Sequence, residues 1–473
     1  MRFVPGAVLA ALVALVAVFA ITGRVSSGER VSMLVTGGTV VTMDAAGTVI
    51  PDGAVAINGT TIVAVGPAGE IADRYSGAQT VSARGQIILP GLINTHGHAP
   101  MVLYRGLADD LALMDWLTKY IFPAEAATVS PAFVRAGTRL AALEMIESGT
   151  TTFADMYYFE DDIAQVTKDA GLRAVLGQSV IRFPVADAKT PEEGLARADA
   201  FIRRWKDDPL ITPAVAPHAP YTLEPHSLQG ARALANRHGV PMLIHLAETR
   251  DEIKIIQDTR GTTPTQFLEG LGLWEGRSLA AHAVWLDDLD MGVLGRRGVG
   301  LAHNPESNMK LASGVAAVPA WIARGLRAGL GTDGAASNND LDMFEAMRAA
   351  ALLHKLTSNN PQALPARQAL ELATRRGADA LGLGDSIGSL EPGKQADLIT
   401  VATDSARMTP MFDAISHLVY AARGDDVRST IVAGRVLMQN RRVRTLDRNE
   451  VLAEARGHAD RVREAVAAGA RKD

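Results

Sequence analysis

Residues 87–98 have the sequence Ile-Ile-Leu-Pro-Gly-Leu-Ile-Asn-Thr-His-Gly-His, an apolar run that ends in two histidines. The apolar part, residues 87–93, is typical of a buried strand. Residues two apart on a strand or its extension point the same way, so His96 and His98 can reach one metal ion. Because a His-x-His pair is common by chance, its meaning depends on what surrounds it along the chain.

The strand at 87–93 is the first of eight short apolar strands that alternate with helical patterns between residues 87 and 387. The other seven are expected at 151–154, 173–176, 211–216, 242–245, 279–281, 299–302 and 329–331. Eight strand–helix units in about 300 residues predict a (β/α)8 barrel of the α/β class, rather than an open doubly wound sheet. No glycine-rich phosphate loop follows any of these strands, so nothing suggests a nucleotide cofactor.

Both ends of the chain have a different sequence pattern, in which short runs of β-branched residues are separated by turns such as Asp52-Gly53 and Asn58-Gly59. Residues 31–86 and 388–446 are therefore predicted to form one small β-sandwich domain beside a catalytic barrel at 87–387. Residues 447–473 are rich in Ala, Arg and Glu and predict a C-terminal helix.

The composition excludes several classes of protein. The 473 residues carry 47 basic and 52 acidic side chains, a net charge of −5, which argues against nucleic-acid binding. There is no cysteine, which excludes disulfides, thiolate nucleophiles, zinc fingers and iron–sulfur clusters. Any metal ion must be held by His, Asp or Glu.

The N-terminus begins with an apolar, uncharged run at residues 4–21, between Arg2 and Arg24. This pattern predicts a signal peptide or membrane anchor within residues 1–30, and hence an exported or membrane-attached protein on the periplasmic side. A true start at Met33 would instead leave a cytoplasmic protein. The sequence leaves open whether the segment is cleaved or retained.

Six of the 11 histidines fall at or just after the ends of predicted strands: His96, His98, His218, His245, His282 and His303. In a (β/α)8 barrel the C-terminal ends of the strands form the active-site face. His245 can add a third nitrogen ligand to His96 and His98, and Asp333 can add a carboxylate. Three histidines and one aspartate with an open position are typical of a catalytic metal site, where an ion activates water.

Two further side chains can transfer protons there. Glu248 lies three residues after His245 and can act as a general acid or base, although a loop carboxylate or a first-turn acid of a helix fits the same position. His282 can orient water or stabilise developing charge. The strand at 211–216 ends in Pro217-His218-Ala219-Pro220 without a lysine that could bridge two ions, which favours one metal ion over two.

With these residues the chain resembles the amidohydrolase superfamily from about residue 33 to 446, most closely the methylthioadenosine/S-adenosylhomocysteine deaminases and related chlorohydrolases. The strings that carry the resemblance are Pro90-Gly91-Leu92-Ile93-Asn94-Thr95-His96-Gly97-His98, Arg105-Gly106-Leu107-Ala108-Asp109-Asp110-Leu111, Ser148-Gly149-Thr150-Thr151-Thr152, His245-Leu246-Ala247-Glu248-Thr249, His303-Asn304-Pro305-Glu306-Ser307-Asn308-Met309-Lys310-Leu311, Gly331-Thr332-Asp333-Gly334 and Leu390-Glu391-Pro392-Gly393-Lys394-Gln395-Ala396-Asp397-Leu398.

The resemblance implies one divalent ion, with Zn²⁺ the first choice, held by four ligands: His96, His98, His245 and Asp333. It further implies that Asp333, helped by His282, takes a proton from the metal-activated water. Glu248 would then protonate the ring nitrogen beside the carbon under attack.

For substrate binding, the resemblance implies that Glu125 accepts hydrogen bonds from both ribose hydroxyls, that His218 contacts the substrate, and that Trp116 forms part of the pocket wall.

The expected activity is hydrolytic deamination of a small adenosine-like compound, that is, hydrolysis of a C–N bond other than a peptide bond. Two alternatives remain at this stage. One is an amidohydrolase of another N-heterocycle, such as a chloro-triazine, a cyclic amide, or another purine or pterin. The other is a catalytically inactive barrel that binds ligands. The sequence does not fix the substrate, the metal or the oligomeric state, so a homo-oligomer remains open.

Overall fold

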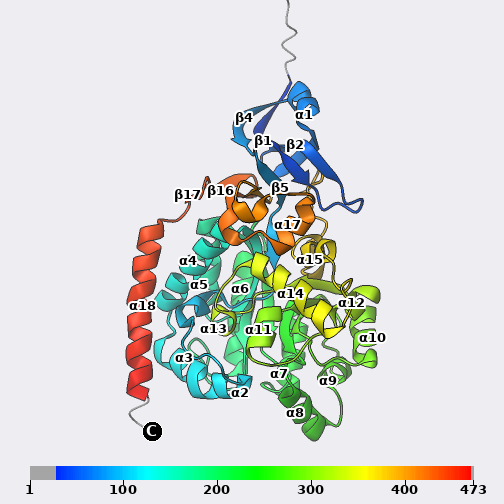
Figure 1. The fold of residues 1–473 in the computed structure, drawn as a ribbon. Coiled ribbons are helices and arrows are strands. Elements are labelled where there is room, and N and C mark those ends of the chain that lie inside the picture. The colour runs from blue at the N-terminus through cyan, green and yellow to red at the C-terminus, as the bar shows by residue number, and fades with distance from the viewer. Residues whose placement is uncertain (1–27, 470–473) are drawn as a thin grey trace, which may run out of the picture.

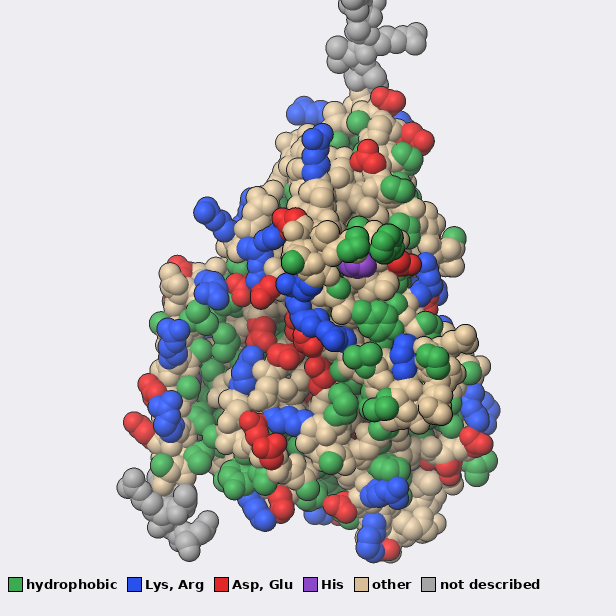
Figure 2. All heavy atoms as spheres, in the orientation of Figure 1, with side chains coloured by type: hydrophobic (Ala, Val, Ile, Leu, Met, Phe, Trp, Pro, Cys, Tyr) green, Lys and Arg blue, Asp and Glu red, His purple; other side chains and the backbone are tan. Residues whose placement is uncertain are grey.

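The computed structural model describes residues 28–469 and contains two β-sheets, one above the other in Figure 1. The lower sheet is surrounded by helices, and the upper one joins the N-terminal and C-terminal parts of the chain. Figure 2 shows basic and acidic side chains interspersed over one face of the molecule, in keeping with the nearly balanced composition.

The lower sheet is a barrel of eight parallel strands in sequence order. The strands are β6 (Leu92–Asn94), β7 (Thr150–Tyr157), β8 (Arg173–Val180), β9 (Ile211–Pro217), β10 (Met242–Leu246), β11 (Ser278–His282), β12 (Gly300–His303) and β13 (Arg327–Leu330). After β6, the backbone N–H of Thr95 donates to the carbonyl of Leu330 over 2.8 Å, which brings the first strand beside the last. The predicted (β/α)8 barrel is confirmed.

Helices cover the outside of the barrel, and short helices lie within the connections between its strands. They are α2 (Leu113–Trp116), α3 (Phe122–Thr128), α4 (Pro131–Ser148), α5 (Glu160–Ala170), α6 (Pro191–Trp205), α7 (Pro225–His238), α8 (Arg250–Arg260), α9 (Pro264–Gly270), α10 (Asp288–Arg297), α11 (Pro305–Lys310), α12 (Val318–Ala323), α13 (Ala335–Asn338), α14 (Met343–Thr357), α15 (Ala366–Leu372) and α16 (Arg375–Ala380), with a 3₁₀ segment η1 (Ala99–Tyr104) and a π segment η2 (Leu117–Ile121).

Local signals explain where these helices begin and end. Ser130, Thr190 and Thr249 precede α4, α6 and α8, and each side chain accepts a hydrogen bond from a backbone N–H in the first turn. Such caps satisfy donors that have no partner within the helix. At the end of α4, Gly149 adopts a left-handed backbone conformation with φ of 87°, which turns the chain directly into β7.

The second sheet is mixed and has nine strands drawn from both ends of the chain, as predicted. Its strands are β1 (Glu29–Val41), β2 (Val49–Asn58), β3 (Thr61–Pro67), β4 (Tyr75–Ser82), β5 (Gln86–Pro90), β14 (Leu398–Ala402), β15 (Val427–Val432), β16 (Arg435–Gln439) and β17 (Arg442–Val443). Helix α1 (Ala68–Arg74) packs beside β2 and β3, and α17 (Ala414–Tyr420) packs against α14 and α15. The two ends meet where β5 pairs antiparallel with β14. Val35, Ile57, Ile88, Leu398 and Ile431 pack together in its core.

The structure corrects the first barrel strand, which was expected to run through residues 87–93. It is divided at Gly91: β5 belongs to the mixed sheet, and only β6 enters the barrel. A Cβ atom on Gly91 would lie 2.0 Å from the Thr151 hydroxyl oxygen, so only glycine allows the backbone to pass here. The proposed limits at 31–86, 87–387 and 388–446 stay a prediction of how the chain divides into folding units.

The C-terminal helix α18 (Arg448–Gly469) lies along α4 and α3 rather than free in solvent. Val451 and Val462 are buried in this contact, and the guanidinium of Arg139 on α4 binds Glu450 and Glu454 over 2.8 and 2.9 Å. The helix therefore braces the side of the barrel that carries the first helices of the catalytic face.

The prediction of an exported or membrane-attached protein is corrected. Within residues 28–469, none of the helices is both long and apolar enough to cross a bilayer. Crossing takes about 20 apolar residues, and the run at 4–21 on which the prediction rested lies outside the described residues. Strand β1 begins at Glu29, before Met33.

A buried ion pair fastens the barrel to the mixed sheet. Arg173, at the start of β8, donates from Nε to Asp397 Oδ2 over 2.8 Å, and both side chains are less than a tenth exposed. Asp397 Oδ1 also accepts from the backbone N–H of Ala433 over 2.7 Å. We expect Asp397→Ala to lower the free energy of unfolding by about 3–5 kcal/mol, because it leaves a buried guanidinium without its partner.

Urea denaturation followed by circular dichroism measures this change. The matched control is Asp258→Ala, which breaks an exposed pair with Lys254 and should leave the midpoint unchanged. Equal midpoints for Asp397→Ala and the unaltered protein would show that the pair does not join the two parts.

Candidate active site

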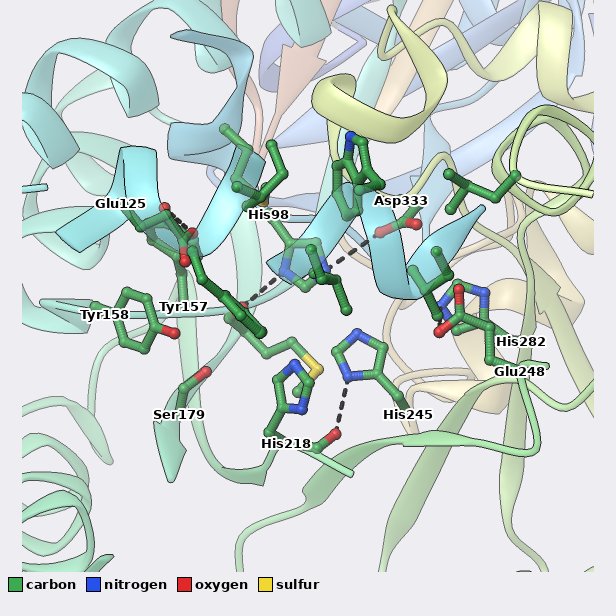
Figure 3. A pocket seen from close by; sticks show the side chains of 18 of the residues that line it. His98, Glu125, Tyr157, Tyr158, Ser179, His218, His245, Glu248, His282 and Asp333 are labelled. Atoms are coloured by element: carbon green, nitrogen blue, oxygen red, sulfur yellow. Dashed lines mark hydrogen bonds and ion pairs between the residues drawn. The ribbon is translucent and has the colours of Figure 1, made fainter. Parts of the chain in front are cut away.

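The C-terminal ends of the barrel strands bring most of the predicted side chains into one cavity. His98 follows β6, His218 follows β9, His245 lies in β10, His282 ends β11 and Asp333 follows β13. All five line the same cavity, together with Glu125, Trp116 and Glu248 (Figure 3). His303 does not join them, because its Nε2 faces Nε2 of His354 on α14 over 3.2 Å in the buried interior.

Three imidazoles and one carboxylate meet at the floor of this cavity. Ligand-type nitrogens of His96, His98 and His245 all lie within 4.8 Å of one another. Asp333 Oδ1 lies 3.4 Å from His96 Nε2 and 3.2 Å from His98 Nε2. A second group with the same spacing joins His96 and Asp333 to His282, so His282 stands immediately beside the cluster.

Hydrogen bonds to the backbone orient the histidines for metal binding. The ring of His98 meets the carbonyl of Met156 through Nδ1 over 2.8 Å, and His245 meets the carbonyl of His218 in the same way. Since a carbonyl can only accept, Nδ1 carries a proton in both rings, which leaves Nε2 as the nitrogen that can bind a metal ion. His96 Nε2 is buried without a hydrogen bond of good geometry. This donor set fits a divalent ion.

Asp333 is the charged centre of the cluster. Its backbone has a φ of 62°, and its Oδ2 accepts from the hydroxyls of Ser307 and Ser337 over 2.7 and 2.9 Å. Burial alone would raise the pKa of Asp333, but hydrogen bonds from His96 and His98 outweigh it and hold the pKa well below its usual range. Asp333 is therefore ionised and attracts positive charge.

The same interaction shifts the pKa of His98. Burial lowers the pKa of His98, yet the hydrogen bond and charge of Asp333 prevail and raise it to about 9. A cation bound between the two side chains would replace that proton, because both compete for the same carboxylate.

Glu248 presents a carboxyl group next to the cluster. Its Oε2 lies 3.8 Å from His282 Nε2, and its side chain is less than a tenth exposed. Its loop is held by Glu252, whose carboxylate accepts from the N–H groups of Ala247 and Glu248 over 2.8 and 2.9 Å. Burial, followed by the charges of Asp333 and Glu252, raises the pKa of Glu248 well above its usual value. Burial and these charges thus favour the protonated form of Glu248, which is the form that can donate a proton.

His282 is neutral in this setting. Burial is the main cause that lowers its pKa to about 3, against the opposing charge of Asp333. Its Nδ1 lies 3.2 and 2.9 Å from the side-chain amides of Asn304 and Asn308, which fix the ring. Its backbone φ of 70° is in the left-handed region, as at Asp333, so local strain coincides with the site.

Glu125 lies across the cavity from Glu248 (Figure 3). It belongs to α3, and the hydroxyl of Tyr157 donates to its Oε1 over 2.6 Å. Burial raises the pKa of Glu125 to about 7, against the hydrogen bond from Tyr157. His218 lies beside the cluster, with its ring 4.8 Å from that of His245. Trp116 lines the same cavity, and its buried indole Nε1 makes no hydrogen bond within the described chain.

The sequence did not reveal several side chains that shape the site. Tyr157 was missed because the strand was predicted to end at Ala154, whereas β7 continues through Tyr157. Ser307 lies in a quoted motif but had no assigned role, and Ser337 lies in a short helix that no pattern indicated. Extending each strand to its last apolar residue would have placed Tyr157 at the active-site face.

Comparisons with known proteins agree with this geometry. The model of the amidohydrolase family matches residues 87–437. A 5-methylthioadenosine/S-adenosylhomocysteine deaminase of Syntrophobacter fumaroxidans is 48% identical over 428 residues, which cover 90% of this chain and 98% of the relative. A 5'-deoxyadenosine deaminase of Methanosarcina acetivorans is 44% identical over 425 residues, 89% of this chain and 96% of the relative.

Among solved structures, an adenosine deaminase from Xanthomonas campestris with bound zinc superposes with a TM-score of 0.91 at 41% identity, and the match covers 92% of this chain and all of that one. The family model spans most of the chain, and the relatives align almost from end to end. The chain therefore belongs to the amidohydrolase family.

Proposed function

We propose that this protein is a metal-dependent deaminase of adenosine-like nucleosides, of the methylthioadenosine/S-adenosylhomocysteine type. The observation that carries the proposal is that one cavity holds the Glu248 carboxyl beside the His–Asp cluster and the Glu125 carboxyl on its other side. The first group suits a ring nitrogen that must gain a proton, and the second suits a sugar diol. The names of the relatives support the same substrate class.

We assign the ion to His96, His98, His245 and Asp333. Nitrogen and carboxylate ligands without cysteine are a donor set that zinc uses in catalytic sites, and the related adenosine deaminase holds zinc. A divalent ion here would act as a Lewis acid and lower the pKa of water toward neutrality.

The protein's own side chains then divide the proton transfers. Asp333, with one oxygen fixed by Ser307 and Ser337, accepts a proton from the attacking water, and the neutral ring of His282 orients that water. Glu248 donates its proton to the ring nitrogen next to the carbon under attack, which relieves the charge that develops there. Water adds to this carbon, and Asp333 passes the proton it took from water to the exocyclic amine, so that the C–N bond breaks and ammonia leaves. Glu248 regains a proton from the new hydroxyl group as the product carbonyl forms.

Substrate binding uses Glu125, across the cavity from Glu248. The Glu125 carboxylate accepts from the two ribose hydroxyls, and His218 and Trp116 contact the nucleoside. A second cavity of about 650 Å³ shares Leu117, Phe122 and Tyr221 with the first, which leaves room for a group on the 5' carbon of the sugar. Relatives that act on nucleosides with different 5' groups fit this arrangement.

An ammonia-release screen tests the proposal. The zinc-loaded protein is assayed for ammonia release from adenosine, 5'-deoxyadenosine, methylthioadenosine and S-adenosylhomocysteine and, for comparison, from a pterin. As further comparisons, chloride release from a chloro-triazine and ring opening of a cyclic amide are followed. We expect ammonia from the adenosine compounds and loss of the activity after chelation. Turnover of only the comparison compounds would contradict the proposed substrate class.

Glu248→Gln should lower kcat/KM for every substrate by roughly 10²- to 10⁴-fold, because the amide cannot donate the proton that a carboxyl donates. Steady-state kinetics on adenosine and on 2',3'-dideoxyadenosine measure the loss. Metal content serves as the control and should not change, since Glu248 is not a ligand. Activity within tenfold of the unaltered enzyme would remove Glu248 from the proton transfer.

Glu125→Gln should behave differently, since it keeps the size of the side chain but turns one acceptor oxygen into a donor. A lost hydrogen bond to a charged group costs about 1.5–3 kcal/mol, or roughly tenfold to a hundredfold in kcat/KM. The loss is expected with adenosine and not with 2',3'-dideoxyadenosine, which lacks both hydroxyls. An equal loss on the two compounds would argue against a sugar-binding role.

A further inference from the structure

Glu125 has a single hydrogen-bonding partner among the side chains of the described residues. Its carboxylate is 8% exposed, and the Tyr157 hydroxyl donates to Oε1 over 2.6 Å (Figure 3). Tyr104 and Tyr158 are close enough to feel the charge of Glu125, but neither donates to it, since the Tyr104 hydroxyl is paired with Thr128. Within residues 28–469, Oε2 is left without a protein partner.

The two partners come from elements of different kinds. Tyr157 is the last residue of the barrel strand β7, it is 3% exposed, and its backbone N–H donates to Glu160 over 2.9 Å. Glu125 lies on the seven-residue helix α3, which follows a π segment outside the sheet. The hydrogen bond therefore fixes the position of a carboxylate on a short helix relative to the strands of the barrel.

We propose that Tyr157 is a positioning residue for ribose recognition: it holds Oε1 of Glu125 so that Oε2 and the remaining acceptor positions of the carboxylate face the sugar diol. This inference rests on the proposed function and adds a residue to it. A carboxylate fixed before binding loses less conformational freedom when the two hydroxyls arrive. Without the Tyr157 hydroxyl, the carboxylate can rotate, and the two acceptor oxygens no longer match the diol.

Tyr157→Phe tests the inference because it removes one oxygen atom and keeps the ring. We expect KM for adenosine to rise by roughly tenfold, the scale of one hydrogen bond to a charged group, while kcat changes by less than about threefold. With 2',3'-dideoxyadenosine, the variant and the unaltered enzyme should have the same kcat/KM. A residue that only fills the cavity wall would affect both nucleosides alike.

Tyr104→Phe is the matched control. It removes the hydroxyl of another buried tyrosine, whose partner Thr128 lies on the same helix as Glu125. This variant perturbs α3 without touching the carboxylate, and it should retain the selectivity for adenosine over the dideoxynucleoside. Thermal denaturation of both variants verifies that each is folded.

A double variant tests whether Tyr157 acts through Glu125. If it does, adding Tyr157→Phe to Glu125→Gln should cause no further loss on adenosine. Additive losses, or an equal loss on both nucleosides, would overturn the positioning role while the deaminase assignment stands. If the unaltered enzyme releases no ammonia from any adenosine compound, the proposed function fails, and the role of Tyr157 fails with it.

Discussion

Three imidazoles gathered around one buried carboxylate are the constraint on which the rest of the site depends. His96 and His98 beside Asp333 hold the pKa of its carboxyl well below the usual range, and the same carboxylate raises the pKa of His98 to about 9. Bringing these groups together requires strands from opposite sides of a closed parallel sheet. A (β/α)8 barrel meets that requirement, because the C-terminal ends of all its strands converge on one face.

The charge of the cluster also affects the pKa of side chains around it. The negative charge of Asp333 helps to raise the pKa of Glu248, so a proton donor stands beside a group that attracts cations. At the other wall, Glu125 is buried but bound by a tyrosine. Under the proposed function, Glu248 serves proton transfer at the floor of the cavity and Glu125 serves sugar recognition at its side, so one substrate engages both carboxyl groups.

The sequence indicates that the side chains assigned to the metal come together, because they follow strands of strongly apolar character. His96, His98, His245 and Asp333 each lie at or just after such a run, and parallel strands bring those ends to one edge. Strand ends were less predictable. The division at Gly91 depends on a close approach to Thr151 that is 60 residues away along the chain, and no local pattern contains it.

The sequence also did not predict which side chains form hydrogen bonds with one another. His303 has the same place at a strand end as the other histidines, yet it turns to His354 on α14, a helix whose packing only the fold decides. Tyr157 and Ser337 act through hydrogen bonds to Glu125 and Asp333, and neither residue type is distinctive in the chain. The prediction of localisation rested on hydropathy alone, at residues 4–21, which lie outside the residues that the structure describes.

The most direct test of the account is the metal content of the purified protein, measured by elemental mass spectrometry after chelation and reloading with one equivalent of zinc. We expect one ion per chain in the unaltered protein and a large loss in His245→Ala, which removes one of the four assigned ligands. A protein that retains no zinc, or a His245→Ala variant that retains as much as the unaltered chain, would contradict the assignment of these residues to a metal centre.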